Sequence, residues 1–349
     1  MRKTTIAVAG MGAIGRRHIE LVQASKHCEL VAVVDPVPAP PAFLAGLGVA
    51  QYASLKELLA QARPDGIILA TPNALHVPQA IECIEANVAV LVEKPVAHSV
   101  EEGLRLCEVA ERSRVPVLVG HHRAHSPILE RARQVIREGL LGDLVAVQGS
   151  ALFYKPDDYF DTAPWRRELG GGPILINLIH EIGNLRSLCG EIVAVQAMAS
   201  NTARGFAVED TVCIGLRFES GMLGSFMLSD SAACARSWEQ TSQENLDYAS
   251  YADEDCYVIS GKNGSLSVPT MRLKIYAQPR NRSWFNPFTQ DVAEVKLRDP
   301  LEAQLEHFCA VITGTSAPLV TVRDGLRNLV IVEAIAEAAR TGNIVSTPG

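Results

Sequence analysis

The chain has 349 residues, more than the roughly 250 to 300 residues at which single hydrophobic cores stop growing, so two domains are expected. Hydrophobic residues make up 48% and charged residues 20% of the chain, which excludes disordered and fibrous classes. The 32 Lys and Arg residues are scattered among 39 Asp and Glu residues, giving a formal net charge of −7, so no nucleic-acid partner is indicated.

The cysteines and the amino terminus indicate the cellular compartment in which the protein is expected. Eight cysteines occur singly, without a Cys-x-x-Cys pair, which favours inert thiols in a reducing environment. Arg2 and Lys3 precede an apolar run, as in a secretion signal, but this run is rich in glycine and ends at Arg16 and Arg17 without a cleavage-like segment. No run of about 18 apolar residues is present, so no membrane span is predicted. We therefore expect a cytoplasmic protein.

The first 120 residues alternate short apolar runs with helix-like patterns. Ser54 and Ser99 each precede a glutamate by three residues, which is the capping-box signature of a helix start. Residues 36–41 contain four prolines and are expected to be loop. Strands are predicted at residues 5–9, 30–34, 66–70, 88–92 and 115–119. Apolar strands that alternate with helices predict a doubly wound parallel sheet, the Rossmann arrangement.

Beyond residue 127 the pattern changes. A helix is predicted at 128–138, and strands at 144–153, 192–199, 211–218, 222–229 and 256–260. Turns at 219–221 and 261–264 indicate antiparallel hairpins. Residues 236–255 are polar without clear periodicity, so a mobile excursion is expected, and two helices at 301–313 and 323–341 finish the chain. The second domain is therefore predicted to be α+β with a mostly antiparallel sheet.

The run Gly10-Met11-Gly12-Ala13-Ile14-Gly15 lies between a predicted strand and a predicted helix. Asp35 follows Gly15 by 20 residues, at the end of the next strand. In this context the glycines let the backbone approach a pyrophosphate, the helix amino terminus stabilises its charge, and the acid accepts from ribose hydroxyls. A structural turn or another nucleotide is the alternative. No arginine follows Asp35 to hold a 2′-phosphate, so NAD is favoured over NADP.

Glu93-Lys94-Pro95 follows a predicted parallel strand, and open α/β sheets place their ligands at the carboxyl ends of such strands. Thr71-Pro72-Asn73, with His76, lies at the corresponding end of the preceding strand, which favours a shared cleft over a surface loop. A lysine in such a cleft can polarise or protonate a carbonyl oxygen, and hydride transfer requires proton movement of this kind.

Histidines supply the remaining candidates. His180 lies in an otherwise apolar stretch, with Asn177 and Glu181 as its polar neighbours, and is either a core residue or a cleft residue. His121, His122 and His125 lack nearby Cys or a carboxylate before Glu130, so no metal site is predicted.

With these residues assembled, the chain resembles the family of glucose–fructose oxidoreductase, inositol dehydrogenase and the rhizopine-catabolism protein (Gfo/Idh/MocA) over essentially its whole length. The motifs that occur in family order are the glycine turn, Ala70-Thr71-Pro72-Asn73 with His76, Glu93-Lys94-Pro95, residues 120–127, Trp165-Arg166, the triple glycine 170–172 before His180, and Asp324-Gly325. Together they are specific, although none is specific alone.

The resemblance implies an NAD-binding Rossmann domain at residues 1–122 and an α+β domain at 123–349 for substrate and for oligomerisation through its open sheet, giving a homodimer or homotetramer. The carboxy-terminal helices could pack back on the first domain. Members oxidise sugars or cyclic polyols, or reduce the corresponding ketones. Lys94 matches the active-site lysine, Pro95 a proline that is often cis, and His180 the proposed acid/base, while His122 and Arg123 fall near nicotinamide and substrate.

Two positions depart from the family pattern. Many members carry an aspartate four residues before the histidine, where this chain has Ile176, and another where it has Gly183. An isoleucine cannot tune the imidazole or hold a substrate hydroxyl, so the partner role could pass to Asn177, to Glu181 or to Lys94.

We therefore expect an NAD-dependent oxidoreductase acting on a sugar, polyol or sugar acid, with Lys94 and His180 as its catalytic pair. Tyr154-Lys155, Trp165-Arg166-Arg167 and Arg123 could face the substrate, and arginines that pair carboxylates would favour a sugar acid. A non-catalytic NAD-binding regulator and a metal hydrolase are the competing classes.

Overall fold

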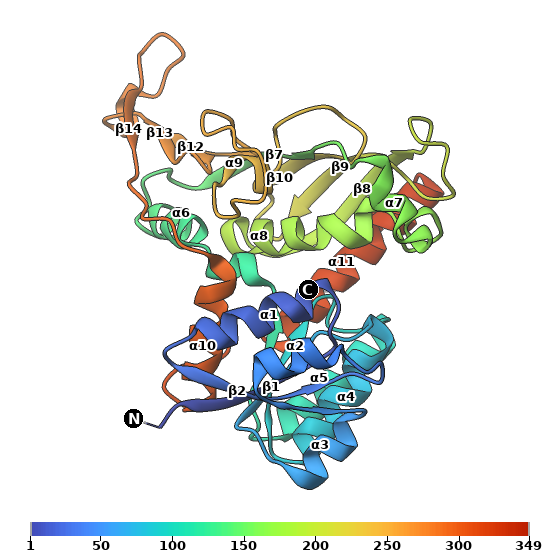
Figure 1. Cartoon of the computed structure of the whole chain (residues 1–349). Helices are drawn as coiled ribbons and strands as arrows, with labels where there is room; N and C mark the ends of the chain where they lie inside the picture. Colours follow the sequence, from blue (N-terminus) through green and yellow to red (C-terminus); the bar gives the residue numbers. More distant parts are fainter. Residues whose placement is uncertain (1, 348–349) are drawn as a thin grey trace. The chain divides into compact units, whose positions relative to one another are not determined.

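The computed structural model describes residues 2–347, which divide into two compact units (Figure 1). Unit 1 contains the chain up to His125 together with Pro300–Leu329, and unit 2 contains Ser126–Asp299 with the chain from Val330 onward. Each unit is built around one sheet. No helix in residues 2–347 is long and apolar enough to cross a membrane.

Unit 1 is a six-stranded parallel sheet in the order β3-β2-β1-β4-β5-β6. The strands are β1 (Thr4–Ala9), β2 (Cys28–Val34), β3 (Ala50–Tyr52), β4 (Gly66–Leu69), β5 (Ala89–Glu93) and β6 (Val117–Gly120). The intervening helices are α1 (Ala13–Ala24), α2 (Pro41–Leu47), α3 (Leu55–Gln61), α4 (Asn73–Glu85) and α5 (Val100–Arg112), and η1 (His122–His125) follows β6. The strand order reverses between β1 and β4, which is where doubly wound sheets bind their ligands.

The core of unit 1 explains why these runs became strands. The side chains of β4 are buried on both faces, which is why its sequence lacks polar alternation. The helix α10 (Pro300–Ile312) returns from the far end of the chain and contributes Leu305, Phe308 and Cys309 to the cluster around Ile6 and Ile68. The predicted Rossmann arrangement is confirmed.

Unit 2 is a nine-stranded sheet in the order β14-β13-β12-β11-β7-β10-β9-β8-β15, in which the described pairs are antiparallel except β7 with β10. The strands are β7 (Leu144–Leu152), β8 (Ile192–Ser200), β9 (Thr211–Phe218), β10 (Leu223–Ser229), β11 (Tyr257–Gly261), β12 (Gly264–Val268), β13 (Arg272–Ile275), β14 (Thr289–Val292) and β15 (Val345–Ser346). The helices and helical turns are α6 (Pro127–Arg137), α7 (Asp157–Asp161), η2 (Pro164–Arg167), η3 (Ile174–Leu178), α8 (Ile179–Cys189), α9 (Trp238–Thr241) and η4 (Pro279–Asn281), together with the part of α11 (Val322–Thr341) from Val330 onward. The predicted second sheet, mostly antiparallel, is confirmed.

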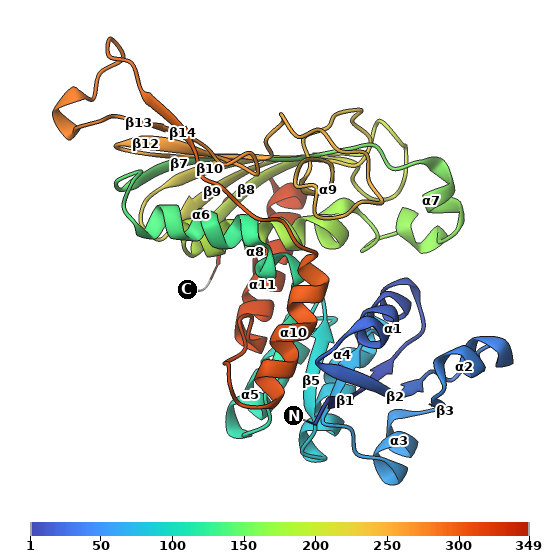
Figure 2. The same ribbon diagram turned by 60° about the vertical axis from the view of Figure 1, so that its left-hand side comes forward.

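The two faces of this sheet differ. One face is covered by α6 and α8, as Figure 2 shows, and Leu185 of α8 with Ile335 of α11 belongs to the core beneath the strands. On the other face Met198, Cys213 and Met227 are cross-strand neighbours, and all three side chains are exposed. A row of exposed apolar residues on a regular sheet is typical of a contact surface.

The expectation of a mobile excursion at residues 236–255 was wrong for its first part. The segment includes α9, whose Trp238 is only 1% exposed and packs against the ring of Tyr257 at 5.9 Å between centroids. The indole nitrogen donates to Glu244, which also accepts from Ser126. The buried Trp238 ring and its hydrogen-bonded indole nitrogen therefore anchor this polar segment. Hydrophobic periodicity cannot identify such an anchored segment, because a single buried residue leaves no repeating pattern.

Candidate functional site

The three motif glycines of unit 1 meet different surroundings. Gly10 has a φ of +91°, and a Cβ there would lie 2.4 Å from the carbonyl oxygen of Ala70. A Cβ on Gly15 would lie 1.9 Å from the carbonyl oxygen of Gly10, so this glycine permits close packing of α1 against the turn. A Cβ on Gly12 would meet no protein atom within 4 Å. Gly12 therefore borders open space, as expected where a ligand approaches the backbone.

The helix amino terminus and Asp35 complete this cradle. No side chain caps α1 at Gly12, so the first amide groups of the helix remain available to an anion. Asp35 accepts from the backbone nitrogens of Met11 at 2.8 Å and of Val37 at 2.9 Å, which fixes its carboxylate beside the glycine turn. An anion-binding turn next to an oriented carboxylate fits the pyrophosphate and ribose of a dinucleotide.

Glu93, the first residue of the Glu93-Lys94-Pro95 motif, is only 5% exposed. Its Oε1 lies 2.8 Å from Nε2 of His18 on α1, and its Oε2 accepts from the backbone nitrogen of Lys94 at 3.2 Å. Burial alone would raise the pKa of Glu93, but the His18 hydrogen bond and the charges of His18, Lys94 and His122 hold the pKa below its usual value. The carboxylate therefore ties the end of β5 to α1 and positions the backbone of Lys94.

His76 connects the two predicted turns. Its Nδ1 lies 2.8 Å from the carbonyl oxygen of Pro95, and its Nε2 lies 2.8 Å from that of Thr71. Burial lowers the pKa of His76, and the two carbonyl contacts oppose that shift. The Lys94–Pro95 peptide bond is cis, and Lys94 itself is half-buried. His76 thus joins the turn that carries Thr71, at the start of α4, to the turn that carries Lys94 and Pro95.

The histidines after β6 lie in separate environments within unit 1. His121 contacts the amide of Asn328 at 3.3 Å, and His125 packs against the ring of His307 at 5.0 Å. His122 is half-buried and Arg123 is only 7% exposed. Among residues 2–347 there is no group of three His, Cys, Asp or Glu side chains that could hold a metal ion.

In unit 2, a buried lysine contacts the polar residue that precedes His180. Lys155 is 8% exposed, and its Nζ donates to Oδ1 of Asn177 at 2.8 Å and lies 3.4 Å from Oδ2 of Asp230. The pKa of Lys155 is lowered to about 8. Burial is the main cause, Arg166 and Arg204 lower the pKa as well, and Asp230 opposes the shift. Lys155 follows β7 and Asp230 follows β10, so the one parallel strand pair described in this sheet brings them together.

The segment that carries Asn177 is a π-helical turn that continues directly into α8 with His180. Such turns often mark functional sites because they widen the helix and redirect side chains. His180 is 8% exposed. Glu181, the other polar neighbour in the sequence, is 2% exposed and accepts a hydrogen bond from the Tyr257 hydroxyl, so its carboxylate anchors the core.

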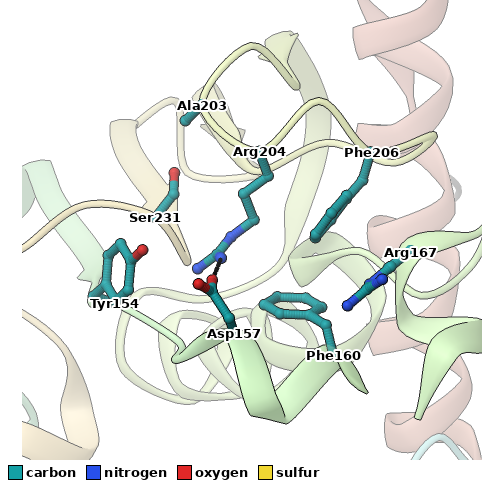
Figure 3. A pocket seen from close by; sticks show the side chains of 8 residues that line it. All are labelled: Tyr154, Asp157, Phe160, Arg167, Ala203, Arg204, Phe206 and Ser231. Carbon is teal, nitrogen blue, oxygen red and sulfur yellow. Dashed lines mark ion pairs between the residues drawn. The ribbon is translucent and has the colours of Figure 1, made fainter. Parts of the chain in front are cut away.

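A pocket of about 350 Å³ lies beside this network (Figure 3). Arg204 runs through it, with its guanidinium 4.5 Å from the Phe160 ring centroid, and Phe206 forms another wall. The residues that line it are Tyr154, Asp157, Phe160, Arg167, Ala203, Arg204, Phe206 and Ser231. Its arginines are paired: Arg204 with Asp230 at 3.0 Å, and Arg167 with Asp161. The pocket walls therefore carry no clear excess of positive charge.

Two predicted substrate residues form a layer beside the pocket. Arg166 stacks on Tyr159 with its guanidinium 3.7 Å from the ring centroid and donates to the Tyr159 carbonyl oxygen. Trp165 is 57% exposed, so its indole is available to a ligand or a neighbouring molecule.

Asp230 and Arg204 were not predicted from the sequence, whereas Lys155 was predicted, together with Tyr154, as a residue that could face the substrate. Their grouping depends on β7 and β10 being parallel neighbours, whereas the turn signals indicated only antiparallel hairpins and did not locate this parallel pair. The rule that carboxyl ends of neighbouring parallel strands share an edge would have joined Lys155 to Asp230, had that pairing been foreseen.

Two family models match the chain. One describes an oxidoreductase family with an NAD-binding Rossmann fold and matches residues 4–121, and the other is the GFO/IDH/MocA C-terminal domain, which matches residues 129–267.

Among curated proteins, the rhizopine catabolism protein MocA of Rhizobium meliloti is 31% identical over 194 residues, which cover 55% of this chain and only 59% of that protein. The 1,5-anhydro-D-fructose reductase of Ensifer adhaerens is 28% identical over 296 residues, covering 83% of this chain and 81% of that protein. Among solved structures, the WlbA dehydrogenase of Bordetella pertussis, in complex with NADH and UDP-GlcNAcA, is 26% identical with a TM-score of 0.78 and full coverage of both chains.

Proposed function

Because the chain belongs to the GFO/IDH/MocA oxidoreductase family with its NAD-binding Rossmann fold, we propose that it is an NAD-dependent dehydrogenase or reductase of CH–OH groups. The predicted family and the predicted cofactor, NAD, are confirmed by the family match. The observation that carries the proposed activity is the position of Lys94. It follows β5 at the ligand-binding end of the sheet, on a turn that His76 joins to Thr71.

The glycine turn and Asp35 hold the cofactor in this proposal. Gly12 leaves room for the pyrophosphate, the amino terminus of α1 faces its charge, and Asp35 accepts from the adenosine ribose hydroxyls. The bound cofactor supplies a nicotinamide carbon that takes up or releases a hydride. Asn73 and His122 border the same edge of the sheet and are proposed contacts of the cofactor.

Lys94 and His180 move the proton. In the oxidative direction the hydroxyl oxygen of the substrate would lose a proton to these residues, while the bound cofactor would supply the hydride chemistry at the carbinol carbon, leaving a carbonyl product. Lys94 hydrogen-bonds the reacting oxygen through Nζ, and the His180 imidazole accepts the proton. In the reverse direction the same groups protonate the carbonyl oxygen.

The substrate is proposed to be a sugar, a cyclic polyol or a sugar acid. This class is supported by similarity to an anhydrofructose reductase and to a dehydrogenase crystallised with a nucleotide sugar acid. Tyr154, Trp165, Arg166 and Arg123 are proposed substrate contacts.

We also propose that the protein forms a homodimer or homotetramer through the open face of the second sheet. This proposal is supported by the exposure of Met198 (72%), Leu223 (58%) and Met227 (40%) on strands of that sheet. Burial of such a face is favourable because it removes apolar surface from water.

Replacing Lys94 by alanine tests the activity. We expect turnover to fall about 10²- to 10⁴-fold, the usual contribution of a positioned acid or base, while the NADH dissociation constant stays within a few-fold. Lys26→Ala, which removes an exposed lysine from the same unit, serves as the control. Turnover of Lys94→Ala equal to that of the control would exclude this role for Lys94.

Position 176 carries isoleucine and not an acidic residue, and this favours one other function, that of an NAD-binding regulator without catalytic activity. The two functions separate in a panel of sugars, polyols and sugar acids assayed by NADH absorbance. A regulator would bind NADH but produce none with any of these compounds.

A further inference from the structure

In the family pattern that the sequence resembles, many members carry an aspartate four residues before the histidine, and this chain carries Ile176 there. The neighbouring polar group, Asn177, does not stand alone. Its Oδ1 accepts from the ammonium of Lys155 at 2.8 Å, and its Nδ2 group has no protein acceptor in the described part of the chain. An amide whose oxygen is bound by a cation becomes a stronger donor through its nitrogen.

Lys155 is not required to neutralise Asp230. Arg204 already pairs with that carboxylate through Nε at 3.0 Å, and its Nη2 donates to the carbonyl oxygen of Lys155 at 2.8 Å. Two buried cations therefore share one buried anion. Holding an extra ammonium out of water is unfavourable unless something compensates it, so the cluster is prepared to accept negative charge.

Charged groups face Lys155 from every element around it. Asp230 after β10 attracts it, and Glu209 before β9 also interacts with it. Arg204 and Arg166 of η2 repel it, and the ring of Tyr159 on α7 lies 4.8 Å from its Nζ. Asp157 of α7 also lies 3.7 Å from Arg204, but its side chain is 86% exposed. The buried ion pairs near Asn177 therefore consist of two cations, Lys155 and Arg204, and one carboxylate, Asp230.

We propose that Lys155 and Asn177 together replace the missing aspartate and reverse its polarity, so that the site selects a substrate that bears a carboxylate. Lys155 is a positioning and specificity residue, which orients and polarises the Asn177 amide. The Asn177 Nδ2 group donates to the substrate carboxylate, where an aspartate would have accepted from a hydroxyl. The substrate class is therefore an aldonate or a uronate. This inference rests on the proposed dehydrogenase function.

The charge on Lys155 is sensitive to pH because its pKa is about 8. Below that pH the ammonium is present and the carboxylate is favoured. As the pH rises above about 8 the ammonium is lost, so kcat/KM for the anionic substrate falls while that for a neutral one does not.

The experiment compares matched pairs of compounds on the purified full-length protein: D-gluconate with D-glucitol, and D-glucuronate with D-glucose. The wild type is expected to have a kcat/KM for the acid about 10- to 100-fold above that for its neutral counterpart, the range of a hydrogen bond to a charged group. Lys155→Met is expected to remove this preference mainly through KM. Arg204 still neutralises Asp230 in that variant, so the fold is retained.

Lys155→Arg keeps a positive charge at all accessible pH values. It is expected to keep the preference for the acid at pH 7 but to lose the decline in kcat/KM above pH 8. Lys262→Met is the matched control, because it removes a lysine from the same unit that forms a surface pair with Asp143 at 2.7 Å. It should behave as wild type.

Three outcomes overturn the proposal. One is a wild type that prefers the neutral member of each pair. Another is a Lys155→Met or Lys155→Arg variant that changes both members equally or leaves the alkaline decline in place. A wild type that reduces no NAD with any of these compounds overturns the proposed function as well, which distinguishes it from the other two.

Discussion

Gly12 and Gly15 are three residues apart and serve different purposes. Gly15 is required by the protein itself, since a Cβ there would collide with the Gly10 carbonyl group. Gly12 has an ordinary negative φ of −67° and open space around it, so nothing in the protein demands a glycine at this position. The remaining explanation for Gly12 is close approach of a ligand.

This difference leads to a paired prediction. Gly12→Ala should leave the melting temperature unchanged or slightly raised, because alanine restricts the unfolded chain by about 0.4–1 kcal/mol, yet weaken NADH binding at least about tenfold. Gly15→Ala should lower the melting temperature. Thermal unfolding and NADH fluorescence titration measure the two effects. An unchanged NADH affinity in Gly12→Ala would contradict the proposed close approach of the cofactor to Gly12.

At the scale of elements, one buried pair joins α1 to β5. His18 is 1% exposed and Glu93 is 5% exposed, so removing either partner leaves the other in a medium of low polarity. The pair lies directly before Lys94, so the same contact that stabilises unit 1 also fixes the start of the proposed catalytic turn.

His18→Leu should therefore lower the free energy of unfolding of unit 1 by about 3–5 kcal/mol, because it leaves the Glu93 carboxylate buried without its partner. Glu93→Gln, which keeps a hydrogen-bonding side chain, should cost less. Guanidinium denaturation at pH 7 measures both. A loss of under 1 kcal/mol in His18→Leu would mean that the pair does not hold the element in place.

Acidification should act through the same region. The folded-state pKa of Glu93 lies below its usual value, so its contribution to stability is present above about pH 4.3 and is lost as the pH falls through the folded pKa. His76 has a lowered folded-state pKa, so protonation of the unfolded chain begins to reduce stability below about pH 6.5. Denaturation at about pH 7, 5.5 and 3 should show both losses, and Glu93→Gln should remove the one below about pH 4.3.

Many of the helices and strands could be predicted from the sequence. Periodicity and capping signals located α1, α4 and α5, and the helix cap at Ser99 accepts from Glu102 as its sequence signature requires. The short strands β3, β13 and β14 were missed, and so was the five-residue β12. Three or four residues, as in β3, β13 and β14, carry too little periodicity, and their pairing depends on tertiary partners.

The candidate site divides in the same way. Residues of unit 1 that follow consecutive parallel strands were predicted together, because topology alone joins Thr71 to Lys94. The contacts of Lys155 with Asn177 and Asp230 in unit 2 were not predicted. These residues come from segments far apart in sequence, and Lys155 meets Asp230 through the parallel pairing of β7 with β10, which local signals do not encode. The roles of Lys94 and His180 remain predictions.

At the scale of the whole molecule, the open face of the second sheet is the proposed assembly surface. Met198→Asp combined with Met227→Asp should shift the mass measured by light scattering toward a monomer, because charged side chains are costly to bury in an apolar contact. Leu104→Asp, on the exposed side of α5, provides the control and should leave the mass unchanged. A double variant with the wild-type mass would place the interface elsewhere.

The chain passes between its two units three times, at residues 125/126, 299/300 and 329/330, and the last passage lies within α11. The dinucleotide-binding half is therefore not a contiguous module that a gene fusion could transfer by a single cut. A fragment that stops at His125 would lack Leu305, Phe308 and Cys309, and would present bare Ile6 and Ile68 to water. Any recombination that exchanges the cofactor-binding unit between relatives must carry residues 300–329 with it. The two segments that form unit 1 would therefore be inherited together, although they lie far apart in the sequence.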